Sequence, residues 1–361
     1  MTKVLNRWTL LAAIGLSATA SAQSSVTIYG IIDAGTTYVS NAGGKSKVVL
    51  TSGILQQSRL GFKGTEDLGG GLSAVFTLEN AFNVDDGSIA NDGTFFSRQS
   101  WVGLKGASGA IMLGRQPTVT SDTIGRYTSA MLLFTSYLTT HPGDYDQTLT
   151  LPVQNSIKYV SPVISGFSGE AQYVFGEVAG TASKNAQFNV GGNYVNGNLS
   201  IGASYLRANG FNIGSGGLLS AAANPFGATS ANDMFKSFGI GASYQFSSNF
   251  VNALVTQSKF DQGQSLARTY EIGFRHDISP RLIFGADYNY TDVFHKARLS
   301  IVGAMLDYKL SKRTDIYLAT AYERVSGKNQ NGGDLVAQLN GMTASGSSNQ
   351  LVTHLGLRHS F

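Results

Sequence analysis

The 361-residue sequence contains no cysteine, so it can form neither disulfide bridges nor thiolate metal sites. Charged residues make up only 13% of the chain, and proline occurs 6 times. After position 22 there is no run of about 18 apolar residues, which excludes a transmembrane helix from the rest of the chain. A chain of this length without crosslinks must be held together by a large closed structure.

The N-terminal segment has the layout of a cleavable secretory signal. Residues 1–22 combine the basic residues Lys3 and Arg7, the apolar run 10–16 and a small-residue ending before Gln23. A membrane anchor, the alternative, would need a longer apolar run to cross a bilayer. We therefore expect a signal peptide over residues 1–22 and a single exported domain over residues 23–361.

The distribution of charge and histidine argues against several functional classes. Lys3 and Arg7 account for half of the formal net charge of +4, and the small remainder does not suggest the basic face that nucleic-acid binding requires. The 5 histidines form no His-x-x-x-His or His-Glu-x-x-His pair, so no metalloprotease motif is present. We expect no enzyme activity, no metal and no cofactor. A Ser/His pair that only the fold brings together is the enzyme alternative that the sequence leaves open.

The chain is rich in glycine and aromatic residues, with 44 glycines, 20 phenylalanines and 16 tyrosines. That composition fits an outer-membrane barrel, a soluble β-sandwich or a β-solenoid. Alternation of apolar and polar side chains predicts strands of the length that a membrane barrel needs. The segments that show it are residues 26–38, 59–66, 72–82, 95–106, 110–116, 155–161, 168–175, 187–195, 199–207, 235–246, 250–260, 268–277, 282–291, 297–309, 315–324 and 350–361.

The lengths of the connections decide between these folds. Short and long connections alternate, as in a transmembrane barrel with short turns at one rim and long loops at the other. A sandwich has no reason to sort them in this way. We therefore predict an all-β fold, a 16-stranded antiparallel transmembrane β-barrel in the cell outer membrane. Along its strands, Glu79 points away from the apolar side, and Trp101 lies opposite Arg98 and Ser100.

One irregular interval, residues 117–153, is too long for an ordinary connection in a compact domain. A wide barrel can fold such a loop into its own lumen, where the loop narrows the hole beside Arg98 and Lys158. We expect the apolar run 131–134 to pack this loop against the wall, and a hydrophobic gate is the alternative.

Several sequence motifs extend over nearly the whole chain after the signal segment. They are residues 26–30 (VTIYG), 58–69 (SRLGFKGTEDLG), 97–99 (SRQ) with 103–104 (GL), 113–116 (LGRQ) and the ending 356–361 (GLRHSF). In these motifs the sequence resembles the Gram-negative general diffusion porins, in the subtype typical of beta-proteobacteria. Phe361 shares a face with Leu351, Leu355 and Leu357 and would end the last strand at an aromatic girdle. In the family, this ending resembles the signal read by the barrel-insertion machinery.

The resemblance implies a homotrimer with one pore per subunit and a third loop folded inward. Arg59 and Arg98 match positions that supply basic residues to the constriction, Lys158 stands where the subtype usually has an arginine, and Glu79 matches an acidic wall position. The third loop departs from the enteric relatives, because residues 129–134 (SAMLLF) replace their Pro-Glu-Phe-Gly signature. The acids available to face the basic wall are Asp122, Asp144 and Asp146.

Three cations at one narrowing would attract anions, because low-dielectric walls focus their field. The alternative is that Arg59, Arg98 and Lys158 only pair with acids and hold the loop in place. We expect passive diffusion of small hydrophilic solutes and ions with an anion preference. The alternatives are a substrate-specific channel and an adhesin or phage-receptor barrel. Expected partners are other copies of the chain, outer-membrane lipid and lipopolysaccharide, the insertion machinery, and small solutes and anions, with no nucleic acid.

Overall fold

The computed structural model describes residues 25–90, 93–149, 152–210, 219–226, 234–261 and 265–361, so the expected signal segment lies outside it. Most of the described chain is β-strand. The strands are β1 (Ser25–Ala42), β2 (Lys45–Ser52), β3 (Arg59–Gly69), β4 (Leu72–Ala81), β5 (Gln99–Gly106), β6 (Gly109–Pro117), β7 (Pro152–Val160), β8 (Phe167–Val174), β9 (Gln187–Asn196), β10 (Leu199–Asn209), β11 (Met234–Phe246), β12 (Asn249–Phe260), β13 (Ser265–Asp277), β14 (Leu282–Val293), β15 (Ala297–Lys309), β16 (Thr314–Gly327) and β17 (Asn349–Ser360). Among these residues, no helix has both the length and the apolar character needed to span a bilayer.

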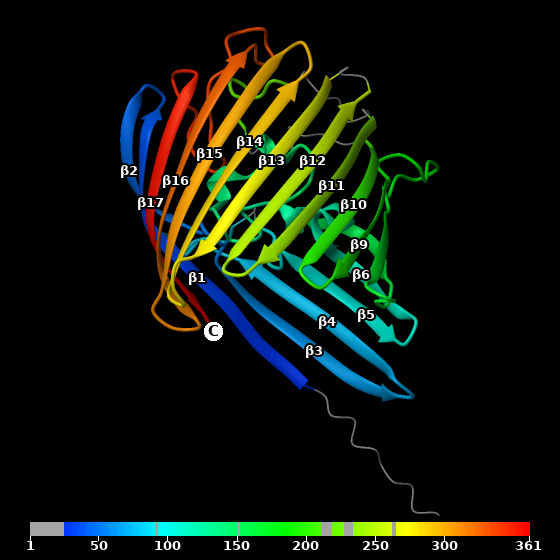
Figure 1. Ribbon diagram of the computed structural model, residues 1–361. Helices are drawn as coiled ribbons and strands as arrows, with labels where there is room; N and C mark the ends of the chain where they lie inside the picture. The colour runs from blue at the N-terminus through cyan, green and yellow to red at the C-terminus, as the bar shows by residue number, and fades with distance from the viewer. Residues whose placement is uncertain (1–24, 91–92, 150–151, 211–218, 227–233, 262–264) are drawn as a thin grey trace, which may run out of the picture.

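The strands form one closed antiparallel sheet. From β3 onward each strand pairs with its neighbours along the chain, and the first strand pairs with the last, with Ile31 opposite Ser360 and Val39 opposite Val352. Figure 1 shows the resulting barrel, in which tilted strands follow one another around the wall. Closure leaves no open sheet edge, which hydrocarbon would not tolerate.

β2 and β3 pair with successive parts of β1, so together they form one strand position of the wall. The 17 strands therefore make a 16-stranded barrel. β1 pairs with β3 through residues 25–31 and with β2 through residues 34–42. The intervening residues 53–58, which we call the β2–β3 link, leave the regular sheet. The predicted sixteen-stranded antiparallel barrel is thus confirmed. β2 itself was not predicted, because its apolar residues Val48, Val49 and Leu50 are consecutive and do not alternate.

Alternate side chains face the lumen and the outside along every long strand. On β13, for example, Thr269, Glu271 and Gly273 are buried inside the barrel, whereas Tyr270 and Ile272 are 44% and 61% exposed. The same outward exposure of apolar residues recurs around the whole barrel, from Ile28 on β1 to Leu355 on β17. A soluble protein rarely exposes so continuous an apolar surface, and a lipid-facing barrel requires it.

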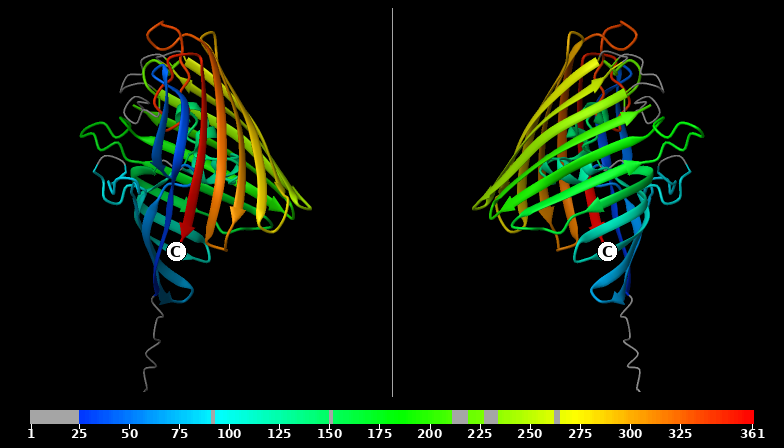
Figure 2. Two further views of the ribbon diagram at one scale, coloured as in Figure 1. Left: turned by 90° about the vertical axis from the view of Figure 1, so that its left-hand side faces the viewer. Right: turned by 90° about the vertical axis from the view of Figure 1, so that its right-hand side faces the viewer.

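The connections differ between the two rims. At one rim the turns are short, for example residues 107–108, 197–198 and 247–248. At the other rim lie long connections, such as those that follow β4 and β16, although the connection after β14, residues 294–296, is short. Figure 2 shows the connection after β16 at the end of the barrel opposite the C-terminus, whereas the connections after β4 and β8 project from its side.

The faces expected for β5 are confirmed only in part. Trp101 lies on the face opposite Ser100, as expected, but Trp101 faces inward with Thr77 and Glu79 while Ser100 faces outward, so the expectation that Trp101 lies opposite Arg98 is wrong. The side chain of Arg98 nevertheless reaches Glu79 inside the barrel. The reason is that β5 begins only at Gln99, so strand alternation does not set the direction of Arg98.

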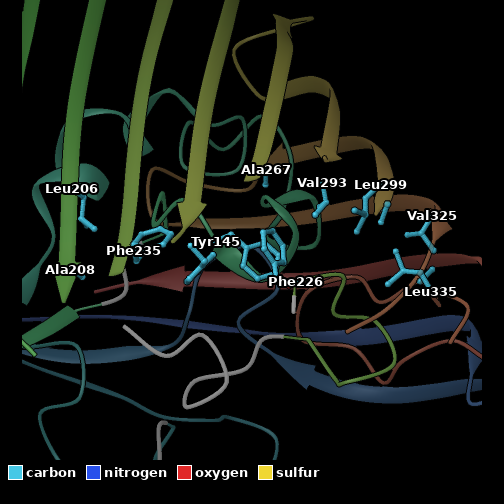
Figure 3. Close-up of a cluster of buried hydrophobic side chains, with 13 residues drawn as sticks. Tyr145, Leu206, Ala208, Phe226, Phe235, Ala267, Val293, Leu299, Val325 and Leu335 are labelled. Carbon is cyan, nitrogen blue, oxygen red and sulfur yellow. The ribbon is translucent and has the colours of Figure 1, made fainter. Parts of the chain in front are cut away.

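A hydrophobic cluster fills part of the lumen near the long-loop rim, where inward side chains of β10 to β16 meet. Figure 3 shows Leu206, Phe235 and Val293 from the wall around Tyr145 and Phe226, which come from connecting segments. The rings of Tyr145 and Phe226 lie 3.4 Å apart between centroids. This packing fills the β10 to β16 side of the lumen near that rim.

Candidate functional site in the lumen

The long connection between β6 and β7 contributes a folded segment, residues 118–149, which we call the internal segment. It contains the helix α1 (Val119–Thr123) and the short 3-10 helices η1 (Gly125–Tyr127), η2 (Tyr137–Thr139) and η3 (Pro142–Asp144). α1 begins where the side chain of Thr118 accepts a hydrogen bond from the backbone N–H of Ser121, a normal N-cap. Local capping and turn chemistry therefore give this irregular stretch a defined shape.

Inward-facing side chains of the wall bind the backbone and side chains of the internal segment. Asn252 donates to the backbone oxygen of Tyr127 over 2.7 Å, and Asn289 donates to the backbone oxygen of Thr139 over 2.5 Å. The hydroxyl of Tyr127 donates to Asn193 over 3.0 Å. Gly241 makes the close approach possible, because a Cβ there would lie only 2.8 Å from that of Tyr127.

A buried ionic cluster anchors the middle of the internal segment. His141 lies between two carboxylates, with Nδ1 against Asp146 and Nε2 at 2.9 Å from Glu271 of β13. Burial alone would lower the pKa of His141, but the two carboxylates raise it well above its usual value. Burial would likewise raise the pKa of Asp146, and the charge of His141 lowers it instead. With a carboxylate at each ring nitrogen, His141 joins the segment to the wall.

The internal segment, which β13 holds through Glu271, also contacts the β2–β3 link. The backbone N–H of Tyr137 donates to the backbone oxygen of Ile54 over 2.9 Å. Leu138 packs in one apolar cluster with Ile54, and Leu133 packs against the cluster that holds Leu55. The link and the segment together bound the remaining open space.

That space is a cavity of about 440 Å³ between the link, the internal segment and the adjoining wall. Arg59 and Arg98 supply its basic lining, and Asp85 is the acidic residue on it. The other lining residues are polar or apolar: Thr51, Ser52, Gly53, Ile54, Leu55, Gln56, Gln57, Asn83, Ala130, Met131, Leu133, Tyr137, Thr140, Leu149, Pro152, Gly341 and Met342.

The two arginines are held side by side by a shared partner. Arg59 donates from Nε to the backbone oxygen of Gln57 over 3.0 Å, and Arg98 donates from Nη1 to its side-chain oxygen over 2.5 Å. Arg98 also lies 2.5 Å from Glu79, whose other oxygen accepts a hydrogen bond from Tyr29 over 2.8 Å. Glu79 is therefore placed behind the arginines and is 3% exposed.

The remaining predicted site residues lie elsewhere in the described lumen. Lys158 pairs with Asp122 at 2.6 Å and also donates to the backbone oxygen of Pro117, where the internal segment begins. Asp144 accepts a hydrogen bond from the backbone N–H of Leu149 inside the segment, and Asp146 belongs to the histidine cluster. The structure thus brings Arg59, Arg98 and Glu79 together, whereas Lys158 is not among the residues that line the cavity.

Sequence reasoning missed the support of the β2–β3 link. Asp33 of β1 accepts hydrogen bonds from the backbone N–H groups of Leu55 and Gln56, at 2.9 and 2.7 Å. Its other oxygen accepts the hydroxyl of Tyr317 over 2.6 Å. An inward aspartate on the first strand was visible in the alternation of residues 26–38, but its partners lie up to 284 positions away.

Among the described residues, no group of three or more His, Asp or Glu side chains is arranged to hold a metal ion. The carboxylates around the arginines and around His141 are engaged by protein donors.

Comparison with known proteins agrees with this architecture. Residues 8–328 match the family described as Gram-negative porin. Outer membrane porin protein 32 of Delftia acidovorans is 31% identical, over 97% of this chain and 98% of its own length. An outer membrane porin protein of Bordetella pertussis is 32% identical over 66% of each chain.

A solved structure has the same fold. The anion-selective porin from Comamonas acidovorans superposes with a TM-score of 0.77 and 25% identity, over 94% of this chain and all of the other. The closed wall, the apolar outer surface and these matches agree along nearly the whole length. The chain belongs to the Gram-negative porin family and is an outer-membrane porin that forms a channel.

Proposed function

We propose that the channel conducts small hydrophilic solutes by passive diffusion and prefers anions. The observation that carries the proposal is the pair Arg59 and Arg98, which share Gln57 and line the lumen cavity. Low-dielectric walls focus the field of such a pair on a passing ion. The name of the similar Comamonas porin, which describes it as anion-selective, supports the same reading.

The net field at the cavity depends on how well the acids offset the arginines. Glu79 is paired with Arg98 and is nearly inaccessible, whereas Asp85 is exposed on the lining. In the hydrogen bonds of the described residues, Arg59 uses only Nε, so its two terminal nitrogens remain available to a passing anion. We infer that Arg59 provides the accessible positive charge and that Arg98 sets its position.

Lys158 is proposed to contribute less to selectivity than the arginines. Its charge is offset by Asp122 at 2.6 Å, and its side chain is only 5% exposed. Its contacts favour the reading in which it holds the start of the internal segment. Asp144 and Asp146 are proposed to serve the shape of the segment in the same way.

The test is the reversal potential of the purified protein in a planar bilayer under a potassium chloride gradient. An anion-favouring potential with ohmic single-channel steps is expected. A cation-favouring potential would contradict the proposal. Saturation of the current by one solute would favour a substrate-specific channel. The absence of any channel current across the bilayer would favour a barrel that acts as an adhesin or phage receptor.

We further propose that the chain assembles as a homotrimer through β1, β3, β4 and β5. The outward faces of these strands combine exposed apolar residues, such as Leu60 and Val102, with the small side chains of Ala34 and Ala74. Small residues allow flat surfaces to approach closely. Light scattering of the detergent complex tests this, and a monomeric mass would contradict it.

A band of outward basic residues supports contact with lipopolysaccharide phosphates. Arg207 lies opposite Lys236, and Lys236 lies opposite Lys259, while Arg268 and Arg298 flank Asp292. All lie near the long-loop rim, beside outward aromatic residues such as Tyr270. Cations beside an aromatic girdle suit the headgroup region of a membrane. Phe361, 43% exposed at the end of the chain, is proposed as part of the signal for the insertion machinery.

The N-terminal segment is proposed to direct export. Residues 1–22 would be removed as a signal peptide, which leaves residues 23–361 as one barrel domain. N-terminal sequencing of the outer-membrane form would test this cleavage, and an intact Met1 would contradict it.

A further inference from the structure

The cavity beside Arg59 and Arg98 is unusual because its other half is apolar. The internal segment contributes Met131, Leu133 and Tyr137, and the β2–β3 link contributes Ile54 and Leu55. Met131 is 42% exposed although it lies inside the barrel. A passage shaped only for hydrated inorganic ions has no use for such a surface, because apolar walls do not replace the water of an ion.

The backbone of the internal segment supports this arrangement. Leu133 has a φ of 57°, in the left-handed region that leucine rarely occupies. Its neighbour Phe134 is 1% exposed and packs edge-on against Phe250 of the wall, with ring centroids 5.2 Å apart. The turn at Leu133 directs the side chain of Phe134 into the wall and that of Leu133 to the cavity. Unfavourable backbone conformations of this kind concentrate at binding sites.

The two halves face each other across a space suited to a small molecule. A volume of about 440 Å³ is within the range of small-molecule pockets. The guanidinium of Arg59, with its terminal nitrogens available, can bind a carboxylate through two parallel hydrogen bonds. An apolar group attached to that carboxylate would then reach Met131 and Leu133 on the other side.

We propose that this cavity is a binding site for amphiphilic organic monoanions, carboxylates that carry an aromatic or branched aliphatic group. Such solutes bind transiently on their way through the channel, with the carboxylate on Arg59 and the apolar group on the face formed by Met131 and Leu133. The inference rests on the proposed anion preference and adds a class of solute to it. Inorganic anions and acetate interact only with the basic half of the cavity, Arg59 and Arg98.

The experiment compares sodium benzoate with sodium acetate as blockers of the chloride current through single channels. Both are monoanions with the same carboxylate and differ in the apolar group. We expect half-block by benzoate at a concentration about tenfold below that of acetate, because even one extra methylene is discriminated about tenfold in an apolar pocket.

A matched pair of variants locates the apolar contact. Met131 lines the cavity and its neighbour Leu132 does not, so Met131→Ser and Leu132→Ser make similar changes at adjacent positions. Met131→Ser should raise the half-blocking benzoate concentration roughly threefold, as expected for loss of a partly buried apolar contact. It should leave acetate and the chloride reversal potential unchanged. Leu132→Ser should leave all three unchanged, and normal chloride conductance shows that each variant is folded.

The outcomes separate this inference from the proposed function. Equal block by benzoate and acetate in the wild-type channel overturns the inference, even if the reversal potential favours anions. An equal loss of benzoate block in Met131→Ser and Leu132→Ser also overturns it. A reversal potential that favours cations refutes the proposed function on a separate measurement.

Discussion

Neutralising Arg98 and neutralising Glu79 should change ion selectivity in opposite directions. The two side chains lie 2.5 Å apart and both are largely buried, at 10% and 4% side-chain exposure. Arg98→Gln leaves the negative charge of Glu79 beside the cavity, and Glu79→Gln leaves both arginines without it. The first variant should lose anion preference, and the second should gain it.

The size of the change follows from Coulomb's law. An ion about 6 Å from a unit charge interacts with it by about 0.7 kcal/mol in bulk water and by about 3 kcal/mol at an effective dielectric constant of 20. Removing the charge changes the energies of an anion and of a cation in opposite directions. The energy difference between the two ions therefore changes by about twice 0.7 kcal/mol, even at the dielectric constant of bulk water. The ratio of chloride to potassium permeability should therefore change roughly tenfold. Salt near 1 M would screen the effect, so the measurement belongs near 0.1 M or below.

The double variant is the control. Arg98→Gln alone leaves Glu79 buried with Tyr29 as its remaining hydrogen-bond donor, and breaking a buried pair costs about 3–5 kcal/mol. Arg98→Gln with Glu79→Gln removes both charges, keeps the net charge and avoids that cost. Its reversal potential should lie close to that of the wild type. If both single variants moved the potential in the same direction, or the double variant moved as far as either, the field argument would be refuted.

Three further predictions concern the anchoring of the lumen. His141→Gln should loosen the internal segment, by about 3–5 kcal/mol for a buried pair, and raise the noise of the open-channel current. Asp146 and Glu271 raise the pKa of His141 against the effect of burial. This anchoring is therefore complete below about pH 6.5 and is lost as pH rises through the raised pKa, so the wild-type noise should grow as the pH is raised above that range. Asp33→Ala leaves two backbone N–H groups unpaired, which should cost about 1–3 kcal/mol of stability each. The barrel should therefore unfold at a lower temperature, measured from the loss of the folded band on gels of samples heated beforehand to increasing temperatures. An unchanged unfolding temperature would contradict this. Phe226→Ala should cost about 3–5 kcal/mol of packing and make its segment newly sensitive to protease in intact cells, whereas unchanged resistance would show that the cluster does not hold the segment.

The sequence was sufficient for the barrel because each strand carries its own signal. Outward and inward residues alternate within one strand, so Tyr270 and Ile272 can be assigned to the lipid face without any knowledge of their neighbours. The motif around Arg59 and the ending at Phe361 also identify the family locally. Short-range pattern and family motif together account for the confirmed fold.

The internal arrangement was less accessible because it depends on contacts between distant parts of the chain. His141 meets Glu271 across 130 positions, and Tyr137 meets Ile54 only once the barrel has closed. The alternation that places β-strand residues also fails where a strand has not begun, as at Arg98. The pairing of Lys158 with Asp122 likewise depends on where the internal segment starts, and no local sequence pattern indicates it.

The interruption of the wall at the β2–β3 link has a consequence for biogenesis. Asp33, which holds the link, is itself bound by Tyr317 from β16, and β1 is completed only by pairing with β17. Asp33 therefore gains its contact with Tyr317, and β1 gains its second neighbour, only when the last strands join the first. Closure of the barrel and completion of the support behind the link are one event.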